Sequence, residues 1–289
     1  MIKIFNYIHI YYITFNLFFK LNNMEFFKLY HNIDEYYDIE RRINKPKWTQ
    51  TASKIINFYI RCFTKDISDE LKNVCAIDTH VHTSYSHCSY DNIEKTLLQA
   101  SKIGLSGICI MDHHTTEGYK KALELKEKFV NEGKMKKDFI LIPGIEYSTT
   151  DGHVGGMFCD KDIYFKKYNA KDTVKLIHDM GGLAICVHPY RKKTGIKNLS
   201  KSLPFDAVEE CAGSIFNKNH AMLNADLTKD FNCAKLGSSD AHFYSFLSSC
   251  YTIFPKETKT LEDVKKAVLE HKTIGKETVN IKIIRKLLG

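Results

Sequence analysis

The sequence predicts an α/β protein whose main part is a (β/α) barrel, preceded by a mainly helical N-terminal extension. From residue 74 onward, short apolar runs alternate with amphipathic runs of helical spacing, which indicates parallel β-α units. About seven such units occupy about 200 residues, and this length favours a barrel over an open sheet. Histidine and carboxylate residues recur where the predicted strands end. We therefore expect a functional site at the end of the barrel where the strands finish.

Local signals define the individual elements. Gly104 ends the first helix of the main part, and Gly181-Gly182 follow the third, as glycine commonly does after a last helical turn. Asp151-Gly152 reverses the chain between two strands. Strands are expected at 75–79, 106–111, 139–143, 153–158, 183–187, 205–211, 233–236 and 249–254, and helices at 92–103, 117–130, 171–180, 216–227 and 261–271.

The composition is that of an ordinary globular protein. Hydrophobic residues make up 44% and charged residues 26% of the 289 positions, which is enough for a substantial core. The formal net charge of +8 is diffuse; it favours a phosphate-bearing substrate but does not by itself indicate nucleic-acid binding. The nine cysteines form no CxxC pair, and an odd number without a disulfide framework indicates a reducing, cytoplasmic compartment.

The first 23 residues stand apart as an apolar extension rich in Ile, Phe and Tyr. Residues 1–19 are long enough for a membrane anchor, but Asn and His residues interrupt the run; the alternative is an upstream extension, with the protein starting at Met24. Residues 24–73 are expected as a helical segment, 74–275 as the main domain and 276–289 as a C-terminal tail. One apolar side of the segment 53–63 is expected to pack on the main domain: Ile55, Ile56, Tyr59, Ile60 and Phe63.

The strand ends carry the chemistry. Asp78, His80 and His82 occupy alternate positions, so in a strand they would project from one face. Carboxylate and neutral imidazole are the main N/O ligands of zinc and similar divalent ions, whereas in a loop the same residues would form a solvated pair. The metal interpretation gains support because such residues recur at six further places: His87/Cys88, His113, Glu146, His153, His188 and Asp240/His242.

Five motifs follow one another in order. They are Asp78-Thr-His80-Val-His82-Thr-Ser-Tyr-Ser, Ile110-Met-Asp112-His113, Gly144-Ile-Glu146 with Asp151-Gly-His153, His188-Pro189, and Gly237-Ser-Ser-Asp240-Ala-His242. Together they resemble the PHP (polymerase and histidinol phosphatase) family of metal-dependent phosphoesterases, in its stand-alone short form, over about residues 74–275. The resemblance implies a distorted (β/α)7 barrel with two or three divalent metal ions, such as Zn, Mn or Fe.

The resemblance also implies a set of metal ligands. His80, His82, Glu146 and Asp240 would hold one ion. Glu146 would bridge to a second ion held by His153 and His188. A third would be held by His113, His242 and either His87 or Cys88; relatives often have an acidic residue where Cys88 stands, and a cysteine ligand would favour zinc. Asp78 and Asp112 are predicted to orient metal-binding imidazoles.

The resemblance to the PHP family implies a site that hydrolyses a phosphate ester through a metal-bridging hydroxide. The expected substrate is a phosphorylated small molecule or a nucleotide. Arg191 and Lys192 would bind the phosphate, although a solvated basic loop is the alternative for these cations. Glu209 or its neighbour Glu210 would shape the substrate site, with a surface position as the alternative. Two other functions remain open, a nuclease acting on short DNA or RNA and an inactive metal-binding regulatory protein. No obligate protein partner is inferred. No GxSxG elbow or GxxxxGK[ST] loop occurs, which argues against serine hydrolases and P-loop nucleotide hydrolases.

Overall fold

The computed structural model describes residues 40, 43–161 and 168–288. The chain divides into two compact units, residues 1–44 and 45–289, and all of the named helices and strands lie in the second unit. The apolar extension expected at 1–23, with its candidate anchor at 1–19, lies outside the described residues. None of the described helices is both long and apolar enough to cross a lipid bilayer.

The described strands form one nine-stranded sheet in the order β7-β6-β5-β4-β3-β2-β1-β8-β9. Neighbouring strands pair in parallel from β1 to β3 and from β5 to β7, as expected for β-α units. In contrast, β4 is antiparallel to β3 and β5, and β8 and β9 continue the sheet beyond β1 in antiparallel pairing. The bounds are β1 Cys75–Val81, β2 Gly107–Ile110, β3 Ile140–Ser148, β4 His153–Met157, β5 Leu183–Cys186, β6 Ala207–Ala212, β7 Ala234–Ser238, β8 Cys250–Phe254 and β9 Ile274–Glu277.

The sheet curls so that β1 and the end of β7 meet. Val81 forms a parallel bridge with Ala241, and the N–H of His82 donates to the carbonyl of Ala241 at 3.0 Å. The Thr79 hydroxyl donates to the carbonyl of Gly237 at 3.1 Å. These contacts nearly close the sheet, which confirms the predicted mixed α/β, barrel-like fold with a helical N-terminal region.

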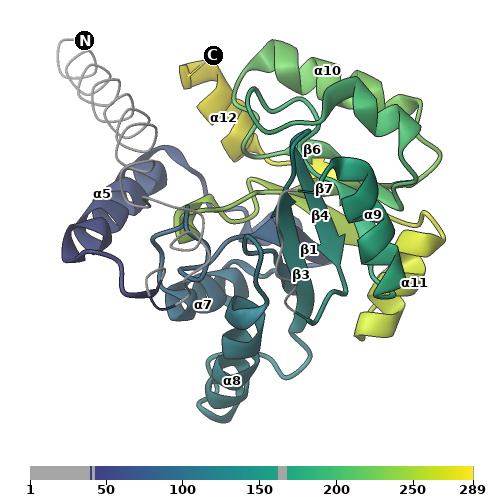
Figure 1. Cartoon of the computed structure of the whole chain (residues 1–289). Coiled ribbons are helices and arrows are strands. Elements are labelled where there is room, and N and C mark those ends of the chain that lie inside the picture. The colour runs from purple at the N-terminus through teal and green to yellow at the C-terminus, as the bar shows by residue number, and fades with distance from the viewer. Residues whose placement is uncertain (1–39, 41–42, 162–167, 289) are drawn as a thin grey trace. The chain divides into compact units, whose positions relative to one another are not determined.

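Helices surround this sheet (Figure 1). Local capping explains several boundaries: the Asn92 side chain accepts from the N–H of Glu94 at the start of α7, and Gly104, with φ of 93°, ends it as expected. Thr260 and Asp263 form a capping box at α11. The helices are α5 Lys47–Phe63, α6 Ser68–Leu71, α7 Ile93–Ile103, α8 Glu117–Asn131, α9 Ala170–Asp179, α10 Lys218–Lys229, α11 Leu261–Leu269 and α12 Val279–Leu288, with short 3₁₀ turns at η1 Lys197–Ser202 and η2 Tyr244–Phe246.

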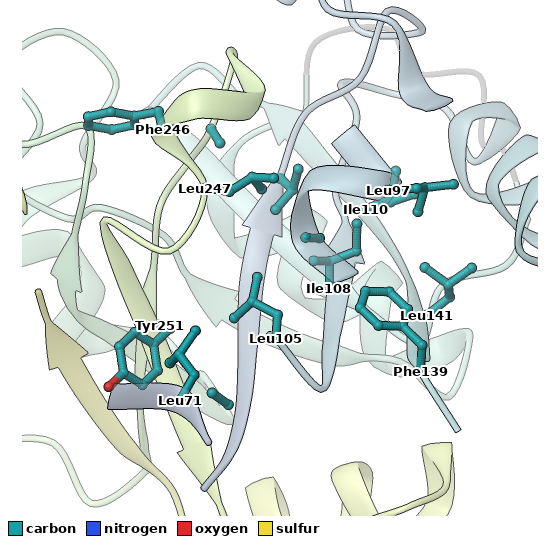
Figure 2. Close-up of a cluster of buried hydrophobic side chains, with 14 of the residues drawn as sticks. Leu71, Leu97, Leu105, Ile108, Ile110, Phe139, Leu141, Phe246, Leu247 and Tyr251 are labelled. Carbon is teal, nitrogen blue, oxygen red and sulfur yellow. The ribbon is translucent and has the colours of Figure 1, made fainter. Parts of the chain in front are cut away.

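Alternate residues of a strand pack into different parts of the core. On β2, Ile108 and Ile110 belong to a cluster that includes Leu97 of α7, whereas Cys109 and the adjacent Met111 belong to another. Figure 2 shows Ile108 and Ile110 among the labelled side chains of the first cluster. Both faces of the central strands are therefore buried, which is why these strands are apolar runs without polar alternation.

Two regions differ from the sequence-based expectation. Residues 274–277 form β9 beside β8, and in the segment expected as a C-terminal tail Ile281 and Ile284 of α12 are buried in the core. The run Ile-Gly-Lys-Glu carries almost no strand signal, and its pairing with β8 is non-local. In addition, α5 buries the polar residues Thr49, Ser53 and Asn57; of the apolar side predicted to pack, Ile60 contacts the core, whereas Ile55 is 45% exposed.

We expect Gly107→Ala to destabilise the fold. A Cβ atom at Gly107 of β2 would press on the carbonyl oxygen of Ile140 and would lie 2.8 Å from the Ile140 Cβ on β3. The backbone of a central strand cannot move away freely, so we expect a loss of about 1–3 kcal/mol in the free energy of unfolding, measured by denaturant titration. Gly133→Asn is the control, because a Cβ there meets nothing within 4 Å and asparagine tolerates its φ of +67°; an equal loss in both variants would contradict the packing argument.

Candidate metal centre

The predicted ligands come together where strands end or begin. His80 and His82 lie at the end of β1, His113 follows β2, and Glu146 lies near the end of β3. Because β4 is antiparallel, it contributes its first residue, His153, to the same end of the sheet. The remaining predicted ligands follow β5 and β7: His188, Asp240 and His242.

Four of these residues form a buried central group. His80, His82, Glu146 and Asp240 each offer a ligand atom, and the four atoms lie within 4.8 Å of one another. The Nε2 atoms of His80 and His82 are 3.1 Å apart, and the His82 Nε2 lies 3.1 Å from both Glu146 Oε2 and Asp240 Oδ1. The His80 Nε2 lies 3.6 Å from each of these two oxygens.

This spacing fits a metal ion. Ligand atoms about 2.1 Å from zinc at the corners of a tetrahedron are about 3.4 Å apart. Glu146 Oε2 and Asp240 Oδ1 are buried and accept no hydrogen bond within the structure, although buried polar atoms nearly always have a partner. Two unsatisfied carboxylate oxygens that face two imidazole nitrogens therefore form a donor set suited to a divalent cation.

Glu146 connects this group to its neighbours. Its Oε1 atom lies 2.7 Å from His153 Nδ1 and 2.9 Å from His188 Nε2. Its Oε2 atom also lies 3.2 Å from His113 Nε2, and His113, Glu146 and His153 form a second group of adjacent ligand atoms. The two oxygens of Glu146 thus face different imidazoles, an arrangement that suits a carboxylate shared between two metal ions.

A third region surrounds Cys88. Its Sγ atom belongs to one group with His82 and His242 and to another with His87 and His113, so both His87 and Cys88 lie within reach of the predicted third site. The Ser86 hydroxyl lies at the centre of this loop, 3.2 Å from His82 Nδ1 and 3.3 Å from Cys88 Sγ. It also accepts from the N–H of His113 at 3.2 Å. This serine was not among the predicted site residues, although it lies directly before His87.

The charges of the centre depend on one another. Burial favours the neutral form of Glu146, but the surrounding imidazoles, first among them His153, outweigh this effect and hold its pKa well below the usual value. Asp240 behaves in the same way, with the Arg191 guanidinium as its strongest stabilising charge, so its pKa is also well below normal. Burial lowers the pKa of His113 far below its usual value. Ionised carboxylates and a neutral imidazole are the forms that bind metals.

The backbone at the centre is strained. His114, His188 and Asp240 have φ values of 57°, 26° and 50°, in a region that residues other than glycine rarely adopt. Such residues each cost on the order of 1–3 kcal/mol and cluster at functional sites. Two of these strained residues direct their side chains into the centre: His188 Nε2 lies near Glu146 Oε1, and Asp240 Oδ1 lies near His82 Nε2.

Glu209, predicted to shape the substrate site, lies behind the centre. It is buried, its Oε1 is 3.0 Å from His80 Nδ1, and its Oε2 accepts from the N–H of His188 at 2.7 Å. Because a carboxylate only accepts, this contact keeps the proton on Nδ1 and leaves the His80 Nε2 lone pair for the centre. Glu209 therefore makes the kind of contact that was predicted for Asp78 and Asp112.

Asp78 and Asp112 hydrogen-bond the backbone of neighbouring loops. Asp78 accepts from the N–H groups of Ser239 and Ser248, both at 2.9 Å, and burial raises its pKa to about 6. Asp112 accepts from the N–H and the hydroxyl of Thr83 at 2.7 and 2.6 Å. The register of β1 against β2 shifts between Asp78 and Val81. Strict alternation along β1 therefore does not predict the direction of the Asp78 side chain.

The two predicted phosphate-binding cations differ in position. The Arg191 Nη1 atom donates to Asp240 Oδ2 at 3.0 Å, and its side chain remains 32% exposed. Lys192 is exposed and follows it on the same loop. Arg191 therefore connects the buried centre with solvent, and Lys192 lies in the solvent-facing part of the loop.

Comparison with known proteins identifies the family. Residues 78–283 match the PHP domain, and the chain therefore belongs to the PHP family. It is 32% identical over 123 residues to the uncharacterised protein MJ1587 of Methanocaldococcus jannaschii, a match that spans 39% of this chain and 67% of that protein. A second match is 51% identical over 37 residues to a probable phosphatase of Caldicellulosiruptor bescii, but it spans only 13% of this chain and 15% of that protein.

Solved structures share the fold. A two-domain protein from Bacteroides vulgatus, which contains a predicted PHP-like metal-dependent phosphoesterase, has a TM-score of 0.57 at 16% identity, over 72% of this chain and 66% of that one. PsfC from Pseudomonas syringae has a TM-score of 0.53 at 17% identity, over 75% of this chain and 97% of that one. At these identities the likeness concerns the fold, which is that of PHP-like metal-dependent phosphoesterases.

We expect Glu209→Gln to weaken metal binding. The amide offers one oxygen where the carboxylate accepts from both His80 Nδ1 and the His188 N–H, so one of these donors must lose its partner or His80 must change tautomer. Loss of such a partner typically costs about 10- to 100-fold in metal affinity. Chelator competition would measure it.

The matched control is Glu210→Gln, one residue further along β6. Glu210 Oε1 accepts from the N–H of Gly275, and a glutamine oxygen can replace it. We expect wild-type metal affinity in this control. Equal affinities for both variants would show that Glu209 does not orient His80.

Proposed function

We propose that this protein hydrolyses a phosphate ester with divalent metal ions held between Glu146, Asp240 and the surrounding histidines. The observation that carries the proposal is the central group, in which two buried carboxylate oxygens without hydrogen bonds face the Nε2 atoms of His80 and His82. Membership of the PHP family and the phosphoesterase fold support the same reaction class.

The donor set supports a proposed assignment of residues to two or three ions. His80, His82, Glu146 and Asp240 would hold one ion, and Glu146 would be shared with a second ion near His153, His188 and His113. A third site would use His113, His242 and either His87 or Cys88; the Cys88 Sγ atom is grouped with His242 and, separately, with His87 and His113. When bound, such ions supply Lewis-acid polarisation of a phosphoryl oxygen and lower the pKa of water.

The exposure of the side chains supports a proposal for the side from which substrate approaches. The side chains of His80, His82 and His188 are completely buried, whereas those of His153 and His242 are 12% and 19% exposed. The Arg191 side chain, which is 32% exposed and donates to Asp240, is more exposed than either of them. A phosphate that approaches on this side meets the guanidinium first, and its remaining N–H groups can donate to phosphoryl oxygens.

The substrate class that we propose is a small-molecule or nucleotide phosphate. One guanidinium nitrogen of Arg191 donates to Asp240, which holds the group beside the proposed ligands. A guanidinium held in this way suits recognition of a single phosphoryl group. The exposed Lys192 and the net charge of +8 add a general attraction for anionic substrates.

We expect His80→Ala and Asp240→Ala each to lose metal and activity together. Mutation of a residue that only hydrogen-bonds a metal ligand typically lowers metal affinity or activity about 10- to 100-fold. Removal of a direct ligand is therefore expected to lower activity more than about 100-fold. Metal content would be measured by mass spectrometry. Activity would be measured on p-nitrophenyl phosphate, 3′,5′-bisphosphonucleotides and short oligonucleotides, each with zinc, manganese and iron.

His178→Ala is the control, because His178 is partly exposed and pairs with Asp206 at 2.8 Å, outside the centre. Full metal content and activity in either ligand variant would refute the assignment. Turnover of oligonucleotides alone would replace the small-molecule substrate with a nucleic acid. Bound metal without turnover of any substrate would indicate a regulatory protein.

A further inference from the structure

Lys45 lies before the segment that matches the family, yet it binds the loop of the third site. Its Nζ atom donates to the carbonyls of Ser84 at 3.0 Å, Ser86 at 2.6 Å and Ser89. A lysine ammonium has three N–H donors, and these carbonyls match that number. His87 and Cys88 lie between the second and third of these carbonyls, so the ammonium holds the backbone on both sides of these two residues.

Helix α5 makes a second attachment to the same loop. The Ser53 hydroxyl donates to Asp91 Oδ1, and the Asn57 amide donates to both Asp91 oxygens at 3.0 and 3.1 Å. All three side chains are buried. This contact explains why α5 turns a polar face towards the domain, because that face binds a buried carboxylate.

The attachment extends to the loop that carries His242. The Ser89 hydroxyl donates to the carbonyl of His242 at 3.0 Å. Asp91 also accepts from the N–H of Tyr244, and Asn57 Oδ1 accepts from the N–H of Ser245 at 2.9 Å. Residues 45–57 thus hydrogen-bond to two loops that are far apart in sequence. One loop carries His87 and Cys88, and the other carries His242.

We propose that Lys45 and the polar face of α5 position the third metal site, by holding the loop of His87 and Cys88 against the loop of His242. This inference rests on the proposed function, since it assumes that the centre binds metal. Lys45, Ser53 and Asn57 lie outside the match at 78–283. The inference therefore gives the segment before the matched domain a role in positioning the site. Lys45 is a positioning residue, because its ammonium binds backbone carbonyls of the ligand loop.

The test compares Lys45→Met with Lys47→Met in the full chain. Methionine keeps the length of the side chain but removes the charge and the donors, and Lys47 is an exposed residue at the first position of α5. Cobalt(II) titration followed by absorption spectroscopy would resolve classes of bound metal, and His242→Ala would identify the class that belongs to the third site.

We expect Lys45→Met to weaken that class about 10- to 100-fold, as the loss of an outer partner does, with the other classes unchanged. Ser53→Ala is a milder second variant and is expected to weaken the same class less. Lys47→Met should match wild type. A general loss of folding would weaken all classes together, so selective loss separates positioning from instability.

Each contrary result has one meaning. A wild-type chain that binds no divalent metal would refute the proposed function. Unchanged affinities in Lys45→Met, with metal bound to wild type, would overturn the inference and leave the proposed function standing. Weakening of all classes together, or no loss of metal in His242→Ala, would equally overturn it.

Discussion

The site depends on the burial of two carboxylates, Glu146 and Asp240, at the centre of a barrel-like sheet. Burying one ionised carboxylate costs several kcal/mol unless charges and donors compensate it. Here the compensation comes from different parts of the chain: imidazoles from the ends of β1 and β5, the first residue of β4, and the Arg191 guanidinium. The antiparallel course of β4 fits this requirement, because a parallel strand at that place would put His153 at the opposite end of the sheet.

Sequence reasoning could predict which residues come together at the centre because strand ends and the period of two are local rules. His80 and His82 are an example, since their spacing alone places both on one side of a strand. Local rules could not find their partners. Glu209 lies 129 positions from the histidine that it contacts, and Asp78 binds amides 161 and 170 positions away. Such pairings follow from how the sheet closes, which no local pattern encodes.

The same limit explains the helix and strand that differ from expectation. The apolar residues of α5 predicted a helix that packs through one apolar side; Ile60 does contact the core, but the buried Asp91 needs donors, and the polar residues Ser53 and Asn57 supply them. An unpaired buried carboxylate costs more than the exposure of a few apolar side chains. In β9, a side chain at position 275 would press on Glu210 of β6, so only glycine fits there. The place of this strand is therefore determined by its contacts with other strands and not by its own residue types.

Charged groups that bind backbone hold the ligand loops in place. Asp78 binds the loops that follow β7, Asp112 binds Thr83, and Lys45 binds the carbonyls around His87. Several ligand residues have strained backbone, which persists only where the surroundings determine it. These buried hydrogen bonds provide that determination during folding. The ordering cost is then met before a ligand binds, and preorganisation of this kind raises affinity without any additional contact. Residues outside the predicted ligand set therefore order the loops that carry it.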